Sequence, residues 1–436
     1  MHKVVDKSFV ERCFNNGPSE MSLDQSAQQL RSDAYKEFCG LSTPTINDEN
    51  WRFTDLSTIY KKKFSPAKKN QDDNRIARRF FRDDTGHRLV FINGVFSKDS
   101  SIVSDKPKGA FYIGTLQESF KFYDRIVKQK LGQISKKNND FFVCLNTSNL
   151  NEGAVVHLGE NASIEKPVHI IWVSTGENFC SNPRLLVNLE KNSSASIVEE
   201  FVSFGASENL TNTVSEISVG EYARLSHGRV QREDLKSFNI GTYGVQLFRG
   251  AHYKKCSVDT GSRISRLNVN IEQVGKDVTC ELDGLSILDK NQLCDLHSKI
   301  LHKEANGNSR QVYKTIVGGA GKAVFNGQIH VTRDGHLTDA SQSNKNLLLT
   351  QKGRVDTKPQ LEIFADEVKC SHGATVGRLD DEEMFYLQAR GISKDMAQKI
   401  LVYGFAAEII QRLDIASLSR ELINQILEQT ESENIL

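Results

Sequence analysis

The sequence predicts a mainly β protein, in which a solenoid of stacked short strands is flanked by an N-terminal α-rich region and a C-terminal helical region. Across residues 140–370 helical periodicity disappears, and short β-rich runs follow one another, separated by Gly, Asn and Asp. Several runs end in a short polar turn before a small or β-branched residue restarts the strand. With Ala195, Ala223, Ala251 and Val278 as restart positions, the steps are 28, 28 and 27 residues, a period that indicates stacked coils.

A large β-sandwich is the alternative fold, since its turns also recur at short intervals. More than 200 residues of uninterrupted short strands exceed one sandwich, so the solenoid is favoured. The predicted organisation is an N-terminal helical and mixed region over 1–138, a β-solenoid core over 139–379 and a C-terminal helical region over 380–436.

Composition describes a globular chain without a bias toward charged partners. The 436 residues are 38% hydrophobic and 25% charged, and the net charge of +1 favours neither nucleic acid nor an acidic membrane surface. No apolar run approaches the roughly 18 residues of a membrane span, and the N-terminus carries no apolar signal region. We therefore expect a cytoplasmic protein whose eight scattered cysteines are free thiols.

The N-terminal region predicts two helices, one hairpin and one loop. Apolar residues at three- and four-residue steps predict a helix over 22–40, and a second helix fits 116–132. An Asn-Gly pair inside 88–97 is a strong hairpin signal. The segment 49–59, with its tryptophan, is expected to pack a helix start onto the next domain, and the polar segment 61–74 is expected to form a mobile loop.

The middle of the chain is a succession of strands with one motif to exclude. The Gly-rich stretch 318–323 resembles a phosphate loop, but Ile316 stands where a Walker A motif needs its first Gly, and Ala323 replaces the Ser or Thr. We interpret the stretch as a solenoid turn and expect no nucleotide to be bound by this chain. The clearest strand candidates are 168–174, 184–190, 196–204, 214–220, 266–274 and 311–318.

The C-terminal region returns to helix. Asp380 can cap a helix that Gly391 ends, and Ser393 can cap the next one, over 394–413. That second helix is apolar on more than one side, so it is either sandwiched within its own fold or offered to a partner. A final helix fits 417–429.

A cysteine and a histidine stand two residues apart in the run 367-EVKCSHG-373. If this run is extended, Val368, Cys370 and His372 share one face, and Gly373 leaves the imidazole uncrowded. A thiol and an imidazole on one face can offer ligands to a transition metal. The same cysteine can equally be a small buried hydrophobe, and a C-x-H pair lacks the spacing of a structural zinc site, so both interpretations stay open.

The run 358-KPQLEIFADEVKCSHGATVGRLDDEEMFYLQARGIS-393, with 340-ASQSNKNLLLT-350 before it and 402-VYGFAAEII-410 after it, closely resembles the SufD side of the SufB/SufD family. The N-terminal stretches NWRFTDL and LVFINGVFS resemble the same family, so the likeness covers essentially the whole chain. Members of this family belong to the SufBCD complex, which assembles iron–sulfur clusters.

The resemblance implies a right-handed parallel β-helix and a non-catalytic scaffold subunit. It implies pairing with SufB through the β-helix and binding of the ATPase SufC through the C-terminal helices. It assigns His372, with Cys370 as the weaker candidate, to a transient iron or nascent cluster at the interface with SufB. The residues expected to contact the SufC partner are Phe385, Tyr386, Arg390, Ile400, Tyr403, Phe405 and Ile409.

One departure separates the chain from SufB. Where SufB-type sequences carry a cluster-building cysteine, this sequence reads Lys352-Gly353-Arg354. A lone thiol and imidazole cannot hold a cluster that usually needs about four protein ligands, so a partner must complete the site.

Two alternatives belong to other classes. A secreted-type β-helix enzyme that cleaves polysaccharides would line one face with carboxylates and aromatics, but the chain has two tryptophans and no signal region. A SufB-like or homodimeric scaffold is the other alternative, and a homodimer of the isolated chain stays open.

Overall fold

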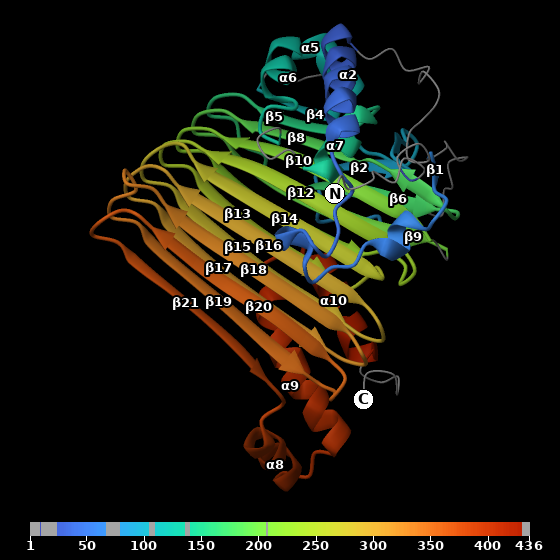
Figure 1. Cartoon of the computed structure of the whole chain (residues 1–436), viewed down its shortest axis with the longest axis vertical. Helices are drawn as coiled ribbons and strands as arrows, with labels where there is room; N and C mark the ends of the chain where they lie inside the picture. Colours follow the sequence, from blue (N-terminus) through green and yellow to red (C-terminus); the bar gives the residue numbers. More distant parts are fainter. Residues whose placement is uncertain are drawn as a thin grey trace.

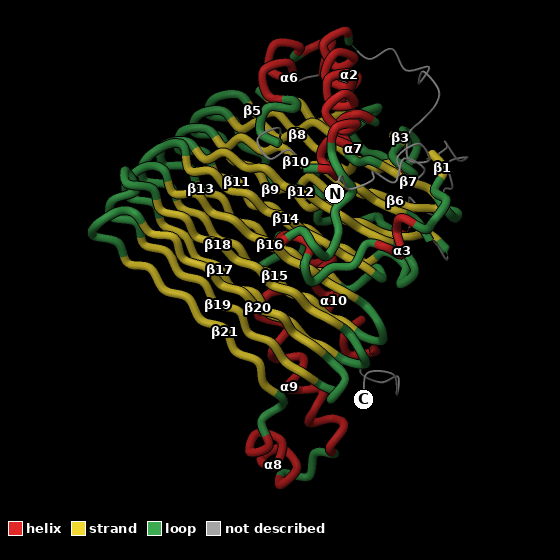
Figure 2. Tube along the Cα trace, in the orientation of Figure 1, coloured by secondary structure: helices red, strands yellow, loops and turns green. Residues whose placement is uncertain are grey.

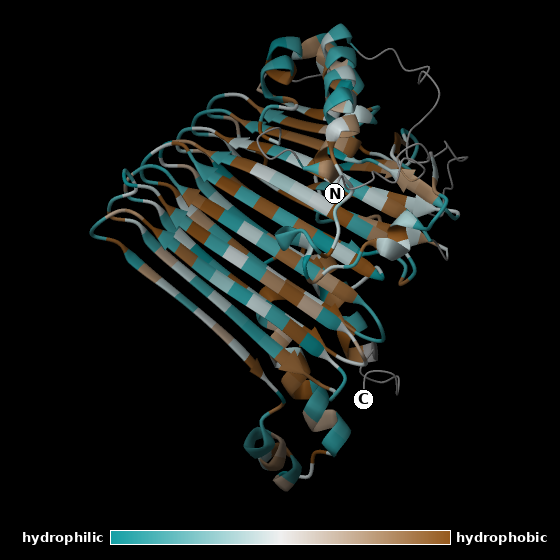
Figure 3. Ribbon diagram, viewed as in Figure 1, coloured by the Kyte–Doolittle hydropathy of each residue, from teal (hydrophilic) through white to brown (hydrophobic). Residues whose placement is uncertain are grey.

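The computed structural model describes Phe9 and residues 24–66, 79–103, 110–135, 140–205 and 208–429. Its centre is the predicted β-solenoid, with about eight turns (Figure 1). The chain alternates between two sheets, and each strand of the stack pairs in parallel with a strand one coil later. Hydrophobic and hydrophilic residues alternate along the strands (Figure 3), as expected where successive side chains point to opposite faces.

The first sheet is one of the two walls of the solenoid. Its parallel order ends at β4, which pairs antiparallel with β5. The two-residue strand β1 and the short β7 pair at its side. Its strands are β1 Ser65–Pro66, β4 Phe111–Thr115, β5 Ala154–Leu158, β7 Phe179–Ser181, β8 Arg184–Leu189, β10 Leu210–Val219, β12 Phe238–Leu247, β14 Ile264–Gln273, β16 Leu293–His302, β18 Lys322–Val331 and β20 Arg354–Ile363.

The second sheet is the other wall of the solenoid. Its parallel order ends at β3, which pairs antiparallel with β2 through the predicted hairpin at Asn93 and Gly94. Side chains from both sheets meet in one long apolar core. The strands of this sheet are β2 His87–Ile92, β3 Val95–Phe96, β6 Val168–Thr175, β9 Ser194–Phe204, β11 Arg224–Arg232, β13 His252–Asp259, β15 Thr279–Leu288, β17 Asn308–Val317, β19 Asp339–Leu348 and β21 Lys369–Gly377.

One corner of the solenoid has a left-handed residue in each coil. Over most of the column, the amide of this residue donates to the carbonyl just before the corresponding residue of the next coil, as from Asn192 to Glu221. Gly250 is required in its coil, because a Cβ there would lie 2.4 Å from the Tyr222 ring and its φ is +64°. The left-handed column is Asn161, Asn192, Tyr222, Gly250, Asp277, Asn306, Leu337 and Glu367.

The predicted period is confirmed in size, but one restart position is wrong. Ala195 pairs with Leu225 and not with Ala223, so the first step of the register is 30 residues rather than 28. The later restart positions lie level with one another, since Arg224 pairs with His252 and His252 with Thr279. The position level with Ala223 therefore lies before Ala195, where the chain passes from the turn into β9. Sequence alone does not show where the strand resumes.

The N-terminal helices confirm most predictions and correct one. The predicted helix over 116–132 is broken at Tyr123, whose φ is −135° and whose ring packs on Tyr112 and His157. Trp51 is buried against Phe142, so the segment 49–59 packs onto the following region as predicted. The elements here are α2 Gln25–Gly40, the 3₁₀ turn η1 Glu49–Trp51, α3 Ser57–Tyr60, α5 Leu116–Phe122 and α6 Asp124–Lys130.

Two further differences concern the junction with the solenoid. Helix α7, Phe141–Ser148, lies where a β region was expected, and it is buried on all sides, so it shows no one-faced periodicity. Its N-cap Asp140 accepts hydrogen bonds from the amides of Phe142 and Val143. Of the loop expected over 61–74, residues 67–74 lie outside the described residues.

The C-terminal helices are α8 Asp381–Ala389, α9 Lys394–Ile410 and α10 Ala416–Gln429. Asp380 and Ser393 cap α8 and α9 as predicted, and Gly391 follows α8 with φ +83°. Helices α9 and α10 pack against the outer face of the second sheet, whereas α8 lies beyond the last coil (Figure 2). The two apolar sides of α9 are explained by this sandwich between the sheet and α10.

The Gly-rich stretch 318–323 is a solenoid turn, as predicted. It joins β17 to β18, and the Gly318 and Ala320 amides donate to the Leu288 and Lys290 carbonyls of the preceding coil. None of the helices in the described part of the chain is long and apolar enough to cross a membrane.

Candidate functional site

The solenoid finishes in two strands whose outer edges are unpaired within the described residues. Strand β20 pairs only with β18, and β21 only with β19. We call these two strands the open end. Almost every residue of β21 is exposed, and the exposed apolar side chains Ile363, Phe364 and Val376 lie at the same end. A long exposed edge of this kind is a template for pairing with another chain.

Cys370 and His372 both lie on β21. Cys370 is half-buried and packs, with Val368, on the last apolar cluster inside the solenoid, which contains Ile329 and Ala340. Burial, helped by the charge of Asp339, raises the pKa of the Cys370 thiol. Its contact with this cluster fits a packing role for the cysteine.

His372 is exposed, two residues further along the same strand. Alternation along β21 places it on the face that Cys370 occupies, at the mouth of the solenoid. A Cβ on Gly373 would meet no atom within 4 Å, so the opposite face of β21 is open at this position as well. The residues that the structure describes contain no group of three or more His, Cys, Asp or Glu side chains placed to hold a metal ion. His372 can therefore supply one ligand to a site that other residues complete.

The residues expected to bind a partner through the C-terminal helices fall into two groups. Phe385 and Tyr386 on α8 are 72% and 55% exposed, and the Arg390 guanidinium lies 4.4 Å from the Tyr386 ring centroid. Ile400 on α9 is also exposed, and Met396, about one helical turn before it and not among the predicted partner contacts, is 50% exposed. We call these five residues the C-terminal patch.

The other expected residues face inward to differing degrees. Tyr403 and Phe405 are half-buried, and Phe405 packs against the cluster between α9 and the second sheet. The Lys314 ammonium lies 4.7 Å from the Phe405 ring centroid. Ile409 is fully buried in the same cluster, so a partner can reach it only through its neighbours.

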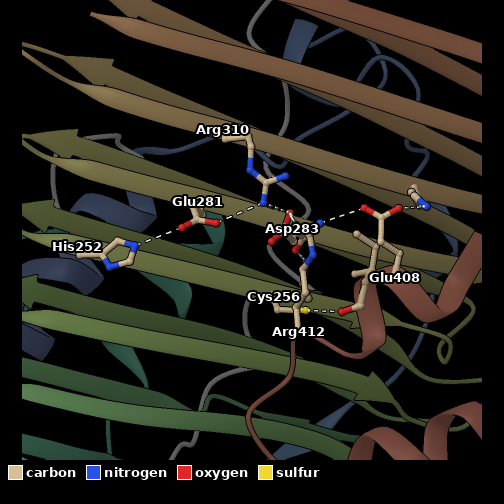
Figure 4. Close-up of polar contacts among 10 residues, drawn as sticks. His252, Cys256, Glu281, Asp283, Arg310, Glu408 and Arg412 are labelled. Atoms are coloured by element: carbon tan, nitrogen blue, oxygen red, sulfur yellow. Dashed lines mark hydrogen bonds and ion pairs between the residues drawn. The ribbon is translucent and has the colours of Figure 1, made fainter.

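A charged seam joins α9 to the outer face of the second sheet (Figure 4). Arg412 donates to the buried carboxylate of Asp283 at 2.5 Å and to Glu408 at 3.0 Å. Lys314 reaches Glu408 at 2.6 Å, and the Cys256 thiol donates to the Ile409 carbonyl at 3.4 Å. These contacts tie the C-terminal end of α9 and the turn after it to strands β13, β15 and β17.

The solenoid interior contains a buried polar cluster that the sequence did not predict. Glu199 accepts hydrogen bonds from Trp172 at 3.0 Å, Tyr243 at 2.8 Å and His227 at 3.0 Å. Burial and the charge of Lys255 lower the pKa of His227 to about 4, so this imidazole is neutral. Although burial alone would raise the pKa of Glu199, the hydrogen bond from His227 and the charge of Lys255 lower it. The only sign of this cluster in the sequence is that polar residues stand at positions whose side chains point into the solenoid by strand alternation.

Comparisons with known proteins match almost the whole chain. The family pattern described as "SUF system FeS cluster assembly, SufBD core domain" matches residues 172–405, and "SufBD protein N-terminal region" matches residues 19–170. An iron–sulfur cluster assembly SufBD family protein from Synechocystis is 35% identical over 88% of this chain and 86% of its own. The iron–sulfur cluster assembly protein SufD of Escherichia coli is 31% identical over 88% of each chain. Protein ABCI7, chloroplastic, from Arabidopsis thaliana is 31% identical over 92% of this chain and 85% of its own.

Proposed function

Because the chain belongs to the SufBD family of SUF-system iron–sulfur cluster assembly proteins, we propose that it is a non-catalytic scaffold subunit of a SufBCD-type complex. The observation that carries this proposal is the open end, where two unpaired parallel strands present His372 beside exposed apolar side chains. SufB supplies the second solenoid, and its strands continue the two sheets across the interface in the cytoplasm.

Iron and the growing cluster are the cargo of this interface. His372 donates an imidazole nitrogen to iron, and SufB donates the remaining ligands. Its exposure on the last strand supports this role, because a ligand shared between two chains must be accessible at the surface of its own chain. Cys370 contributes packing under the strand, in keeping with its burial and its raised thiol pKa.

The C-terminal patch is the docking surface for SufC. Exposed aromatic side chains and a stacked arginine are the residue types that carry most binding energy in protein interfaces. ATP binding and hydrolysis in SufC would pull on α8 and α9. The charged seam then transmits this movement to the second sheet, the sheet that ends in β21.

The test is a His372→Ala variant co-expressed with SufB and SufC. We expect the three-protein complex to co-purify as in the wild type, while anaerobic cluster build-up from ferrous iron, a sulfur donor and ATP falls at least about 10-fold. His336→Ala is the matched control, since His336 is also exposed but lies in the turn between β18 and β19. Wild-type cluster build-up in the His372 variant would refute the proposed role.

The size of the isolated chain tests the homodimeric alternative. A scaffold that works with SufB should give up any self-association when SufB is added. Sedimentation of the chain alone and with SufB measures this exchange. A homodimer that persists with excess SufB would contradict the proposed arrangement.

A further inference from the structure

Gln342 is the immediate neighbour of His372 across the last strand pair. The two residues are Cα partners in the register between β19 and β21, so their backbones lie about 4.8 Å apart. Gln342 is buried, and its side chain crosses the solenoid interior to the opposite sheet. A Cβ added to Gly327 of β18 would lie 1.5 Å from the Gln342 amide nitrogen. The absence of a side chain at Gly327 is therefore what makes room for this amide.

The Gln342 amide is unsatisfied. Neither its nitrogen nor its oxygen has a hydrogen-bond partner among the residues that the structure describes. Leaving such a group buried and unpaired costs about 1 to 3 kcal/mol, so its place needs an explanation. The neighbouring amides of the same strand do donate: Asn344 to the Tyr313 carbonyl at 3.3 Å, and Asn346 to the Thr375 carbonyl at 3.0 Å.

We propose that Gln342 is the positioning residue for His372. The isolated chain does not make a hydrogen bond between these two side chains. Once the partner covers the open end, the His372 ring turns to donate an N–H to the Gln342 amide oxygen, which leaves the other ring nitrogen unprotonated for iron. Metal-bound imidazoles usually need such an outer partner, which fixes the tautomer and the ring direction. This inference rests on the proposed function, because it assigns a second residue to the same site.

Four variants, each co-expressed with SufB and SufC, test the assignment. Gln342→Leu removes the acceptor, and Gly327→Ala displaces the amide without changing it. Gln342→Glu keeps an acceptor oxygen at the same place. Gln311→Leu is the matched control, because Gln311 pairs with Gln342 one coil further from His372 and is equally buried.

The first measurement is ferrous iron affinity of the purified complex, from competition with a chelator in the absence of a sulfur donor. We expect Gln342→Leu and Gly327→Ala to weaken iron binding about 10- to 100-fold, while Gln342→Glu and Gln311→Leu stay close to the wild type. The second measurement is the nitrogen hyperfine coupling of the reduced cluster in electron paramagnetic resonance. The histidine coupling should change in Gln342→Leu and not in Gln311→Leu.

Co-purification and circular dichroism first establish that each variant folds. Wild-type iron affinity and coupling in Gln342→Leu would overturn the proposal, and so would an equal loss in Gln311→Leu. If His372→Ala itself builds clusters normally, the proposed function fails. If His372→Ala is inactive while Gln342→Leu matches the wild type, only the role of Gln342 fails.

Discussion

At the residue scale, the left-handed corner column shows where this chain accepts backbone strain. Asn, Asp and Gly tolerate positive φ, and they fill most of the column. Leu337 is the residue least suited to it, with a φ of 58° and a side chain that is 56% exposed, so little packing offsets the strain. Strained backbone of this kind costs about 1 kcal/mol or more.

We therefore expect Leu337→Asn to raise the free energy of unfolding by about 1 kcal/mol. Urea denaturation measures the change. Leu235→Asn is the control, because Leu235 is 45% exposed but is not among the positive-φ residues. An equal gain in both variants would attribute the effect to lost surface hydrophobicity rather than to backbone strain.

Lys255 is a second residue that lowers the stability of the folded chain. Its ammonium is buried without a hydrogen-bond partner in the described structure and lies 4.0 Å from the Tyr243 ring centroid. Burial lowers the pKa of Lys255 to about 7, although Glu199 opposes the shift. The folded chain therefore releases this proton near pH 7, whereas the unfolded chain keeps it until about pH 10.4.

Lys255→Met should raise the free energy of unfolding at pH 7 by about 1 to 3 kcal/mol. The unfolded state binds more protons than the folded state between about pH 7 and 10.4, so wild-type stability from this group rises with pH there. The advantage of the variant should shrink between pH 7 and pH 9 in urea titrations. A gain independent of pH would show that Lys255 keeps its proton in the folded chain up to pH 9, as a paired ammonium would.

At the scale of elements, the charged seam decides how firmly α9 is held. Removing Arg412 leaves the buried Asp283 carboxylate with Arg310 at 3.5 Å. Breaking a fully buried pair costs about 3 to 5 kcal/mol. We expect about 2 kcal/mol for Arg412→Met, because Arg310 remains near and Arg412 is partly exposed.

Hydrogen exchange locates this loss. Amides of α9 should lose protection in Arg412→Met, while amides of the apolar solenoid core keep theirs. The double variant Arg412→Met with Asp283→Leu should recover part of the stability, since neither charge is then left unpaired. No recovery would mean that the seam acts through shape rather than charge.

The elements also show what sequence could predict. Local signals sufficed where one residue type has one role: Asp380 and Ser393 as caps, Gly391 as a helix end, and the Asn-Gly hairpin. Helix α7 was not predicted, because a helix that is buried on all sides shows no one-faced apolar periodicity in its sequence. The break at Tyr123 depends on rings distant in sequence and has no local signal.

For the site, alternation along 367–373 predicts that Cys370 and His372 share one face. Only the packing of Cys370 on Ile329 and Ala340 shows that the thiol is partly enclosed. The sequence does not predict that Gln342 neighbours His372, because the two residues are 30 positions apart and meet only through the register between β19 and β21. Register of this kind depends on coil lengths, which vary here.

At the scale of the whole molecule, the open end should govern association. Val376 is 49% exposed on β21, and Val376→Lys would place a charge where SufB is proposed to cover it. Burying an unpaired charge is costly, so we expect co-purification with SufB to fall at least about 10-fold. Ile102→Lys is the control, since Ile102 is equally exposed near β2 at the opposite end. Undiminished co-purification would move the SufB interface elsewhere.

The two ends of the solenoid are unequal, and this limits how many copies can join. The parallel stack stops at the antiparallel strands β3 and β4, whereas at the other end β20 and β21 present parallel outer edges that are unpaired within the described residues. A subunit that can pair strands at only one end can join only one partner in this way. Two such subunits that meet open end to open end cover each other's parallel edges, so we expect growth to stop at a pair. We infer that the hairpin at residues 88–97, far from His372, disfavours addition of a further parallel strand to the second sheet.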